Sequence, residues 1–200
     1  GYPLNSYFLY RTDGYFKDQA EVDRYYALYG EGKEDLTGVG AGSASRLRPG
    51  DTKRLDLNGD YKISGAGNEN SDLQYLGDSN PHFVFGFTLG GSWKGIDVNA
   101  MFQGVGKQYV IRNDWMAYPF QTRTANQNPT YLGKTWTESN PNAEFPRLTT
   151  NANLARWNYQ NNDFMMQNNR YIRLKTLIVG YTLPQIWTRK VKLEKVRVYF

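Results

Sequence analysis

The chain has 200 residues, a formal net charge of +5 and no cysteine. The lack of cysteine excludes a disulfide framework and a thiolate site. The mean hydropathy is −0.69, and the sequence has no run of about 18 apolar residues, the length of a membrane-spanning helix. No block of lysine and arginine is interleaved with stacking aromatic residues, so the sequence does not indicate nucleic-acid binding.

The first predicted elements are a strand and a short helix. An irregularly alternating segment, about Ser6–Phe16, predicts the strand. Asp18 then provides an N-cap, Glu21 completes a capping box, and Gly30 ends the helix. The face that this helix buries is expected to consist of residues at helical spacing, namely Ala20, Tyr25 and Leu28.

The segment Asp56–Ser64 resembles the first half of a calcium-binding loop. Three oxygen-bearing side chains at alternate positions could converge on one cation, and they are Asp56, Asn58 and Asp60. The match is incomplete, because Tyr61 stands where such a loop needs glycine and Gly67 where it needs glutamate. Two alternatives therefore stay open, a Ca²⁺ site and a metal-free turn stabilised by its own side chains.

Two alternating runs, His82–Trp93 and Ile96–Gln103, meet at the two-residue turn Lys94-Gly95. Each is about as long as a tilted strand that crosses a bilayer. One face carries large apolar side chains and the other small or polar ones, which predicts lipid on one side and a water-filled lumen on the other. The expected lipid-facing residues are Phe83, Phe85, Phe87, Leu89, Ile96, Val98 and Phe102. The expected lumen-facing residues are Asp97, Asn99 and Gln103.

Two further strands are predicted near the end of the chain, at about Arg170–Leu183 and Leu193–Phe200. Alternation along the first of them places six residues on one face: Tyr171, Arg173, Lys175, Leu177, Val179 and Tyr181.

The connections between the predicted strands are alternately long and short. Residues 17–81 and 104–169 form the long ones, and residues 94–95 and 184–192 the short ones. Long extracellular loops and short periplasmic turns are typical of a transmembrane β-barrel. We therefore predict an all-β fold of about five antiparallel barrel strands with two long extracellular loops.

The second long connection is rich in asparagine and proline and also carries large aromatic side chains. Such side chains need either burial or a ligand. The candidates for ligand contact are Trp115, Tyr118, Trp136 and Arg147. With one histidine and no cysteine, Ser–His and Cys–His nucleophile arrangements are nearly excluded. Spacing alone leaves paired carboxylates for glycoside cleavage open, but no residue set for them stands out, and we predict that the chain is not an enzyme.

Several segments, in this order, resemble the C-terminal part of SusC-like (RagA-like) TonB-dependent outer-membrane transporters. They are Gly1-Tyr2-Pro3-Leu4, Thr12-Asp13-Gly14-Tyr15-Phe16, Pro49-Gly50-Asp51, Asp56-Leu57-Asn58-Gly59-Asp60, Asn80-Pro81-His82-Phe83, Phe85-Gly86-Phe87, Phe102-Gln103-Gly104, Trp136–Leu148, Tyr171-Ile172-Arg173-Leu174-Lys175 and Gly180-Tyr181-Thr182-Leu183-Pro184. Each is weak alone, but the ordered set spans nearly the whole chain.

The resemblance implies a 22-stranded barrel in the bacterial outer membrane, in contact with outer-membrane lipid. It implies import of oligosaccharides or peptides, energised by TonB through an N-terminal part, and a SusD-like surface lipoprotein that acts as a lid. The plug domain and the TonB box are expected to lie outside this chain. The four loop residues named above then become candidates for contact with substrate or lid. Catalysis is not implied.

An alternative is a secreted, calcium-dependent, glycan-binding β-sandwich. In that case the apolar rings of the hairpin would pack against a second sheet instead of lipid. The choice between glycan and peptide as substrate stays open at this level.

Overall fold

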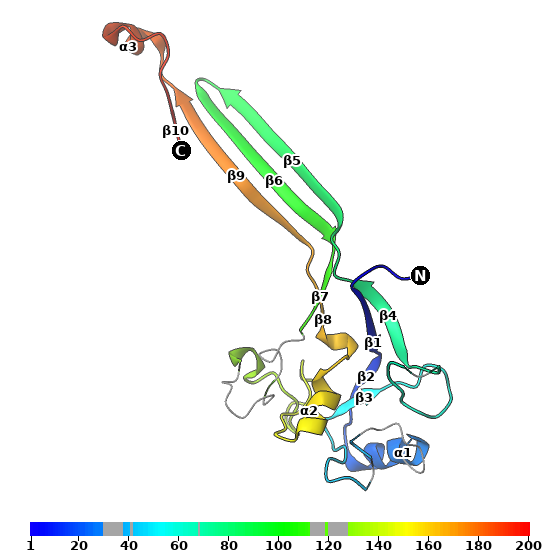
Figure 1. The fold of residues 1–200 in the computed structure, drawn as a ribbon. Coiled ribbons are helices and arrows are strands. Elements are labelled where there is room, and N and C mark those ends of the chain that lie inside the picture. Colours follow the sequence, from blue (N-terminus) through cyan, green and yellow to red (C-terminus); the bar gives the residue numbers. More distant parts are fainter. Residues whose placement is uncertain (30–37, 41, 68, 113–118, 120–127) are drawn as a thin grey trace. The chain divides into compact units, whose positions relative to one another are not determined.

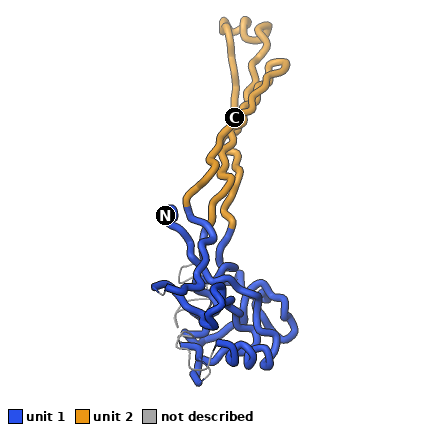
Figure 2. The backbone as a smooth tube through the Cα atoms, turned by 90° about the vertical axis from the view of Figure 1, so that its right-hand side faces the viewer, with its two compact units in different colours: residues 1–79, 110–167 blue, residues 80–109, 168–200 orange. Residues whose placement is uncertain are grey.

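The computed structural model describes residues 1–29, 38–40, 42–67, 69–112, 119 and 128–200. These residues form two compact units, shown in different colours in Figure 2. Unit 1 comprises Gly1–Ser79 and Val110–Gln167, and unit 2 comprises Asn80–Tyr109 and Asn168–Phe200. None of the described helices is long and apolar enough to cross a membrane.

Unit 2 is built on a four-stranded antiparallel sheet with the order β10-β9-β6-β5 (Figure 1). The strands are β5 (His82–Trp93), β6 (Ile96–Lys107), β9 (Tyr171–Thr182) and β10 (Arg197–Tyr199). The predicted hairpin is present, and β6 continues beyond the predicted end at Gln103. Its turn residues Lys94 and Gly95 have φ values of 48° and 87°, as in the left-handed two-residue turns that match the twist of paired strands.

The connection from β9 to β10 contains more regular structure than a plain turn. Helix α3 (Gln185–Thr188) is followed by the 3₁₀ helix η3 (Arg189–Val191). Backbone pairing of the last strand begins before β10, where the N–H of Leu183 donates to the carbonyl of Val196.

A β-bulge in β9 changes the predicted faces of that strand. Met101 of β6 pairs with Thr176, but its neighbour Phe102 pairs with Leu174, so Lys175 has no partner on β6. Because side chains alternate strictly along a strand, one extra residue moves every following side chain to the opposite face. The predicted grouping was therefore wrong: Leu174 joins the apolar face, and Arg173 lies on the polar face.

The described residues of unit 1 form short strands and two α-helices. Strand β1 (Ser6–Tyr10) pairs with β4 (Leu73–Asp78), and β2 (Thr12–Tyr15) pairs with β3 (Thr52–Arg54). The helices are α1 (Gln19–Tyr29) and α2 (Ala152–Tyr159), with 3₁₀ helices η1 (Pro129–Tyr131) and η2 (Asp163–Met165). A further two-stranded sheet joins β7 (Tyr109–Ile111) to β8 (Met166–Asn168).

The single strand predicted over Ser6–Phe16 was wrong, because this segment forms two strands in separate sheets. The change occurs at Arg11, whose carbonyl accepts from the N–H of Leu55. The N–H of Tyr10 donates to the carbonyl of Asn161, outside the β1–β4 pair. The irregular alternation of this segment reflects the change of partners.

The predicted N-terminus of α1 is confirmed. The Asp18 carboxylate accepts the backbone N–H of Glu21 at 2.8 Å, and the Glu21 carboxylate accepts the N–H of Lys17 at 2.7 Å. Side-chain acceptors thus satisfy amides at the helix start, which have no partner within the helix. Gly30, predicted to end the helix, lies outside the described residues.

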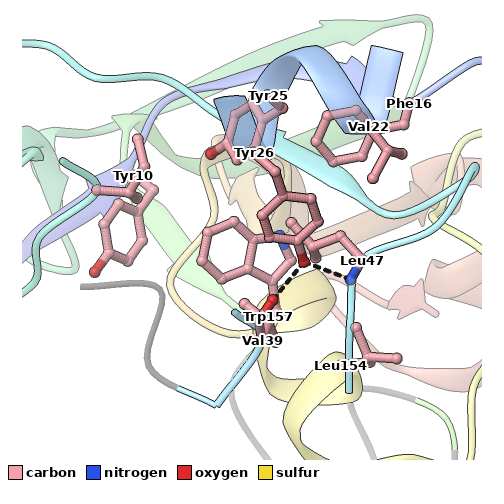
Figure 3. Close-up of a cluster of buried hydrophobic side chains, with 10 residues drawn as sticks. Tyr10, Phe16, Val22, Tyr25, Tyr26, Val39, Leu47, Leu154 and Trp157 are labelled. Atoms are coloured by element: carbon pink, nitrogen blue, oxygen red, sulfur yellow. Dashed lines mark hydrogen bonds between the residues drawn. The ribbon is translucent and has the colours of Figure 1, made fainter. Parts of the chain in front are cut away.

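The buried face of α1 was predicted correctly at Tyr25 alone. Its buried residues are Val22, Tyr25 and Tyr26, whereas Ala20 and Leu28 are exposed. These three side chains belong to the main hydrophobic cluster of unit 1, shown in Figure 3. The cluster consists of Tyr10, Phe16, Val22, Tyr25, Tyr26, Val39, Leu47, Ile63, Leu154 and Trp157.

The hydroxyl of Tyr26 connects three segments inside this cluster. It accepts the N–H of Leu47 at 2.7 Å and donates to the carbonyl of Val39 (Figure 3). Burial raises the pKa of Tyr26, so the neutral phenol that can make both hydrogen bonds is the stable form. A second cluster in unit 1 consists of Tyr131, Phe145, Tyr159 and Met165.

Candidate functional site

The three predicted lumen-facing residues lie together on the polar face of the sheet. Asp97 pairs with Gly180, Asn99 with Ile178, and Gln103 with Arg173. Directly opposite residues of an antiparallel pair share a face, so the β-bulge adds the guanidinium of Arg173 beside Gln103. The polar face therefore carries groups able to bind sugars or peptides.

An ion pair crosses β9 on this polar face. Arg197 of β10 binds Asp97 of β6 through two atoms: Nε donates to Oδ1 at 2.9 Å, and Nη2 contacts Oδ2. Gly180 lies on the strand between them, and a Cβ there would be 2.6 Å from Nη2 of Arg197 and 2.7 Å from Oδ1 of Asp97. The pair can form because residue 180 has no side chain. Sequence reasoning missed Arg197, although a glycine inside a strand signals a close approach.

The opposite face of the sheet is apolar and exposed. The residues predicted to face lipid are between 39% and 78% exposed, except for Phe102, which is half-buried. The rings of Phe87 and Phe102 stack across the hairpin with centroids 5.0 Å apart. Strand β9 extends this face, because its exposed residues Leu174, Leu177 and Val179 pair with Phe102, Ala100 and Val98. A contiguous apolar surface of this kind marks a face that another apolar phase covers.

Trp136, a predicted contact residue, packs on the backbone of Gly50 in unit 1. Gly50 has a φ of 86°, and a Cβ at this position would be 2.3 Å from Cε3 of the indole. Trp136 is only 9% exposed, and its backbone N–H donates to the carbonyl of Phe145 at 2.8 Å. The turn Pro49-Gly50-Asp51 and the segment Trp136–Leu148, far apart in the sequence, thus form one packed module.

Arg147 binds the same turn through its third residue, Asp51. Its Nε lies 2.7 Å from Oδ1 of Asp51, and its Nη2 donates to Oδ2 at 3.0 Å. Asp51 is fully buried and also accepts from the side chain of Asn158 and the N–H of Arg48. Burial raises the pKa of Asp51, and the Arg147 guanidinium opposes this shift. Two positions predicted to meet a ligand therefore also hold the scaffold together.

Arg147 nonetheless reaches a cavity. A cavity of about 440 Å³ is lined by Arg48, Arg147 and three consecutive polar residues, Thr149, Thr150 and Asn151, among others. The side chain of Arg147 is 18% exposed, so it can bind Asp51 and still meet a ligand. The other two contact candidates, Trp115 and Tyr118, lie outside the described residues.

The calcium-like loop is held by hydrogen bonds to its own backbone. The Asp56 carboxylate accepts the N–H groups of Gly59 and Tyr61, and the side chain of Asn58 accepts that of Asp60. Tyr61 has a φ of 62°, so it adopts the conformation for which such loops use glycine.

This geometry leaves the calcium prediction untested. The Asp60 carboxylate accepts the N–H of Lys62 at 2.9 Å. The described part of the chain contains no group of three or more histidine, aspartate or glutamate residues placed to hold a metal ion. The Ca²⁺ site formed by Asp56, Asn58 and Asp60 therefore stays a prediction.

The chain resembles known proteins, although no protein-family model matches it. The TonB-dependent receptor P3 of Formosa agariphila is 29% identical over 152 residues, which are 76% of this chain and 14% of the receptor. The resemblance to TonB-dependent receptors is thereby confirmed. The same match supports the predicted location in the bacterial outer membrane.

The second resemblance concerns the fold. The structure of the RagAB peptide importer in its "closed-closed" state aligns with the whole chain at a TM-score of 0.50 and 23% identity, and the chain covers 19% of that importer chain. The strand-rich architecture of units 1 and 2 is therefore also found in the RagAB peptide importer. The chain corresponds to a small part of each of these longer proteins.

Proposed function

We propose that the chain is part of the barrel wall and outer loops of a TonB-dependent outer-membrane importer. The observation that carries this proposal is the four-stranded sheet of unit 2, which has one exposed apolar face and one polar face once the bulge at Lys175 is taken into account. Lipid would cover the apolar face, and the polar face would line the lumen.

In this arrangement, residues 17–81 and 104–169 are extracellular loops, and residues 94–95 and 184–192 are periplasmic turns. The strands β5, β6, β9 and β10 would contribute to a 22-stranded barrel. Most residues of these loops belong to unit 1, whose cavities and arginines would meet the substrate or a SusD-like lipoprotein lid. TonB would act through a plug domain elsewhere in the protein. The family resemblance supports oligosaccharides or peptides as cargo, and the role is transport, not catalysis.

Thiol labelling of the full-length receptor in its own outer membrane tests the orientation of the sheet. Leu174→Cys and Arg173→Cys are a matched pair, because they are neighbours in the sequence on opposite faces. We expect a lipid-soluble maleimide alone to label Cys at position 174, and a membrane-impermeant maleimide to reach position 173. Reversed labelling would contradict the faces assigned by the bulge.

The partner proposal requires a separate measurement. Detergent extraction of the tagged full-length receptor should co-purify one surface lipoprotein, whereas a receptor that leaves the membrane in plain buffer without a partner would contradict the importer. The secreted, calcium-dependent, glycan-binding β-sandwich would then be the leading account.

A further inference from the structure

Arg54, the last residue of β3, is a buried cation in unit 1. It is 8% exposed, and its guanidinium carbon lies 3.9 Å from the ring centre of Tyr10 and 4.2 Å from that of Trp157. Its Nε donates to the side-chain oxygen of Asn162 at 2.9 Å, and its Nη2 donates to the carbonyls of Trp157 and Gln160, both at 3.0 Å.

All of these acceptors are neutral. Among the ion pairs between described residues, none includes Arg54, whereas the other largely buried arginine of unit 1, Arg147, binds the carboxylate of Asp51. A buried charge without a counter-ion is costly, because it loses hydration and gains no Coulomb partner. Burial lowers the pKa of Arg54 to about 10, which reflects that penalty.

A cavity of about 270 Å³ adjoins this cation. Its lining includes a second arginine, Arg156 of α2, which is exposed, together with the carboxamides of Asn153, Gln160 and Asn161. No aspartate or glutamate is among the described residues that line it. The cavity is slightly smaller than the usual range for ligand pockets, about 300–1,000 Å³, so it suits one terminal unit of a longer ligand.

We propose that this cavity binds a carboxylate at the end of the transported ligand. The carboxylate would accept hydrogen bonds from Arg54 and Arg156, and the carboxamides would bind the adjoining polar groups. The same chemistry fits the C-terminal carboxylate of a peptide and the carboxylate of a uronic acid sugar. The inference rests on the proposed import function and specifies the substrate class.

Calorimetry on the full-length receptor, purified with its partner, tests this proposal with single-unit probes. The charged probes are N-acetyl-tyrosine and glucuronate, and their neutral counterparts are N-acetyl-tyrosinamide and glucose. We expect at least one charged probe to bind and its neutral counterpart to bind at least about tenfold more weakly, the size of one lost charge-assisted hydrogen bond. The charged probe that binds identifies the source of the carboxylate.

The variant Arg156→Gln should weaken binding of the charged probe about tenfold. Arg24→Gln is the matched control, because Arg24 is an exposed arginine on α1 outside the cavity. Equal binding of charged and neutral probes, or no binding of either charged probe at millimolar concentration, would overturn the proposal. The proposal would also be overturned if Arg156→Gln lowered the melting temperature of the receptor but left binding of the charged probe unchanged. Arg156 would then stabilise the fold and not bind the ligand.

Failure of this inference can be separated from failure of the import function. The thiol-labelling pair at positions 173 and 174 is read on the same full-length receptor in its own outer membrane. Correct labelling without a carboxylate preference would refute the cavity proposal and leave the importer in place.

Discussion

Gly50→Ala is the substitution with the sharpest expected effect on unit 1. The new Cβ would lie 2.3 Å from Cε3 and 2.6 Å from Cδ2 of Trp136. Neither partner can move freely, because Trp136 is 9% exposed and both backbone groups of Gly50 are hydrogen-bonded, its N–H to Phe16 at 2.7 Å and its carbonyl to Arg147 at 2.9 Å.

Two costs add at this position. A left-handed φ of 86° costs an alanine about 1 kcal/mol, and overpacking of a fixed core costs about 1–3 kcal/mol more. We therefore expect Gly50→Ala to lower the free energy of local unfolding by about 2–4 kcal/mol. Gly14→Ala is the matched control, because Gly14 has a φ of 68° but a Cβ added there would have nothing within 4 Å.

Hydrogen exchange measured by mass spectrometry on the full-length receptor provides the assay, because it reports local opening without unfolding the barrel. Peptides that cover Pro49-Gly50-Asp51 and Trp136–Leu148 should lose protection together in Gly50→Ala. In Gly14→Ala the loss should be about 1 kcal/mol and confined to the β2 region. Equal losses in the two variants would refute the contact with Trp136 as the source of the effect.

Three further outcomes are expected. Gly180→Ala should disrupt the Arg197–Asp97 ion pair and so lower the temperature at which the folded, heat-modifiable band disappears from a gel. Replacing Arg197 in the Gly180→Ala variant should then lower that temperature no further; if the two decreases add, the two substitutions do not act on the same ion pair. Leu174→Arg should cost about 2–4 kcal/mol in the bilayer and reduce the folded yield, whereas Arg173→Gln should be tolerated; equal yields would contradict the assigned faces. If the loop binds calcium, about 1 mM Ca²⁺ should protect residues 56–72 from proteolysis in the unmodified protein but not in Asp56→Ala. If the rate of cleavage changes with neither Ca²⁺ nor a chelator, the loop does not bind the metal.

The hairpin could be predicted from the sequence because its signals are local. Alternation over His82–Trp93 and a two-residue turn at Lys94-Gly95 depend on neighbours in the chain, and the structure has both. The capping box at Asp18 is local in the same sense. When all the interacting residues lie close together in the sequence, as in these two cases, the structure agrees with the prediction from the sequence pattern.

The faces of β9 could not be predicted in the same way. Strict alternation of side chains places Arg173 on the same face as Leu177. The bulge at Lys175, however, depends on pairing with β6, about 70 residues earlier in the sequence. A sequence read strand by strand has no information on the partner. The placement of Leu174 on the apolar face therefore required the register.

The candidate contacts in the second long loop illustrate the same limit. Trp136 and Arg147 stand out by composition, and composition alone cannot distinguish a side chain that meets a ligand from one that packs on a turn near residue 50. The deciding contacts come from a segment about 90 residues away in the sequence. There Gly50 leaves room for the indole of Trp136, and the buried carboxylate of Asp51 binds the guanidinium of Arg147. Arg54 was missed because its environment comes from two segments far from it in the sequence, one with Tyr10 and one with Trp157.

The two units obtain their stability from different sources. Both hydrophobic clusters found among the described residues lie in unit 1, where aromatic side chains pack on one another and on α1 and α2. The sheet of unit 2 instead exposes its apolar residues, with Leu89 at 59% and Val198 at 62%. Since burial of apolar area is the main favourable term in folding, unit 2 needs an external apolar phase and neighbouring strands, whereas unit 1 has its own core. In the proposed importer, this core would keep Arg54 and Arg156 in place independently of the membrane, ready to meet the ligand before transport.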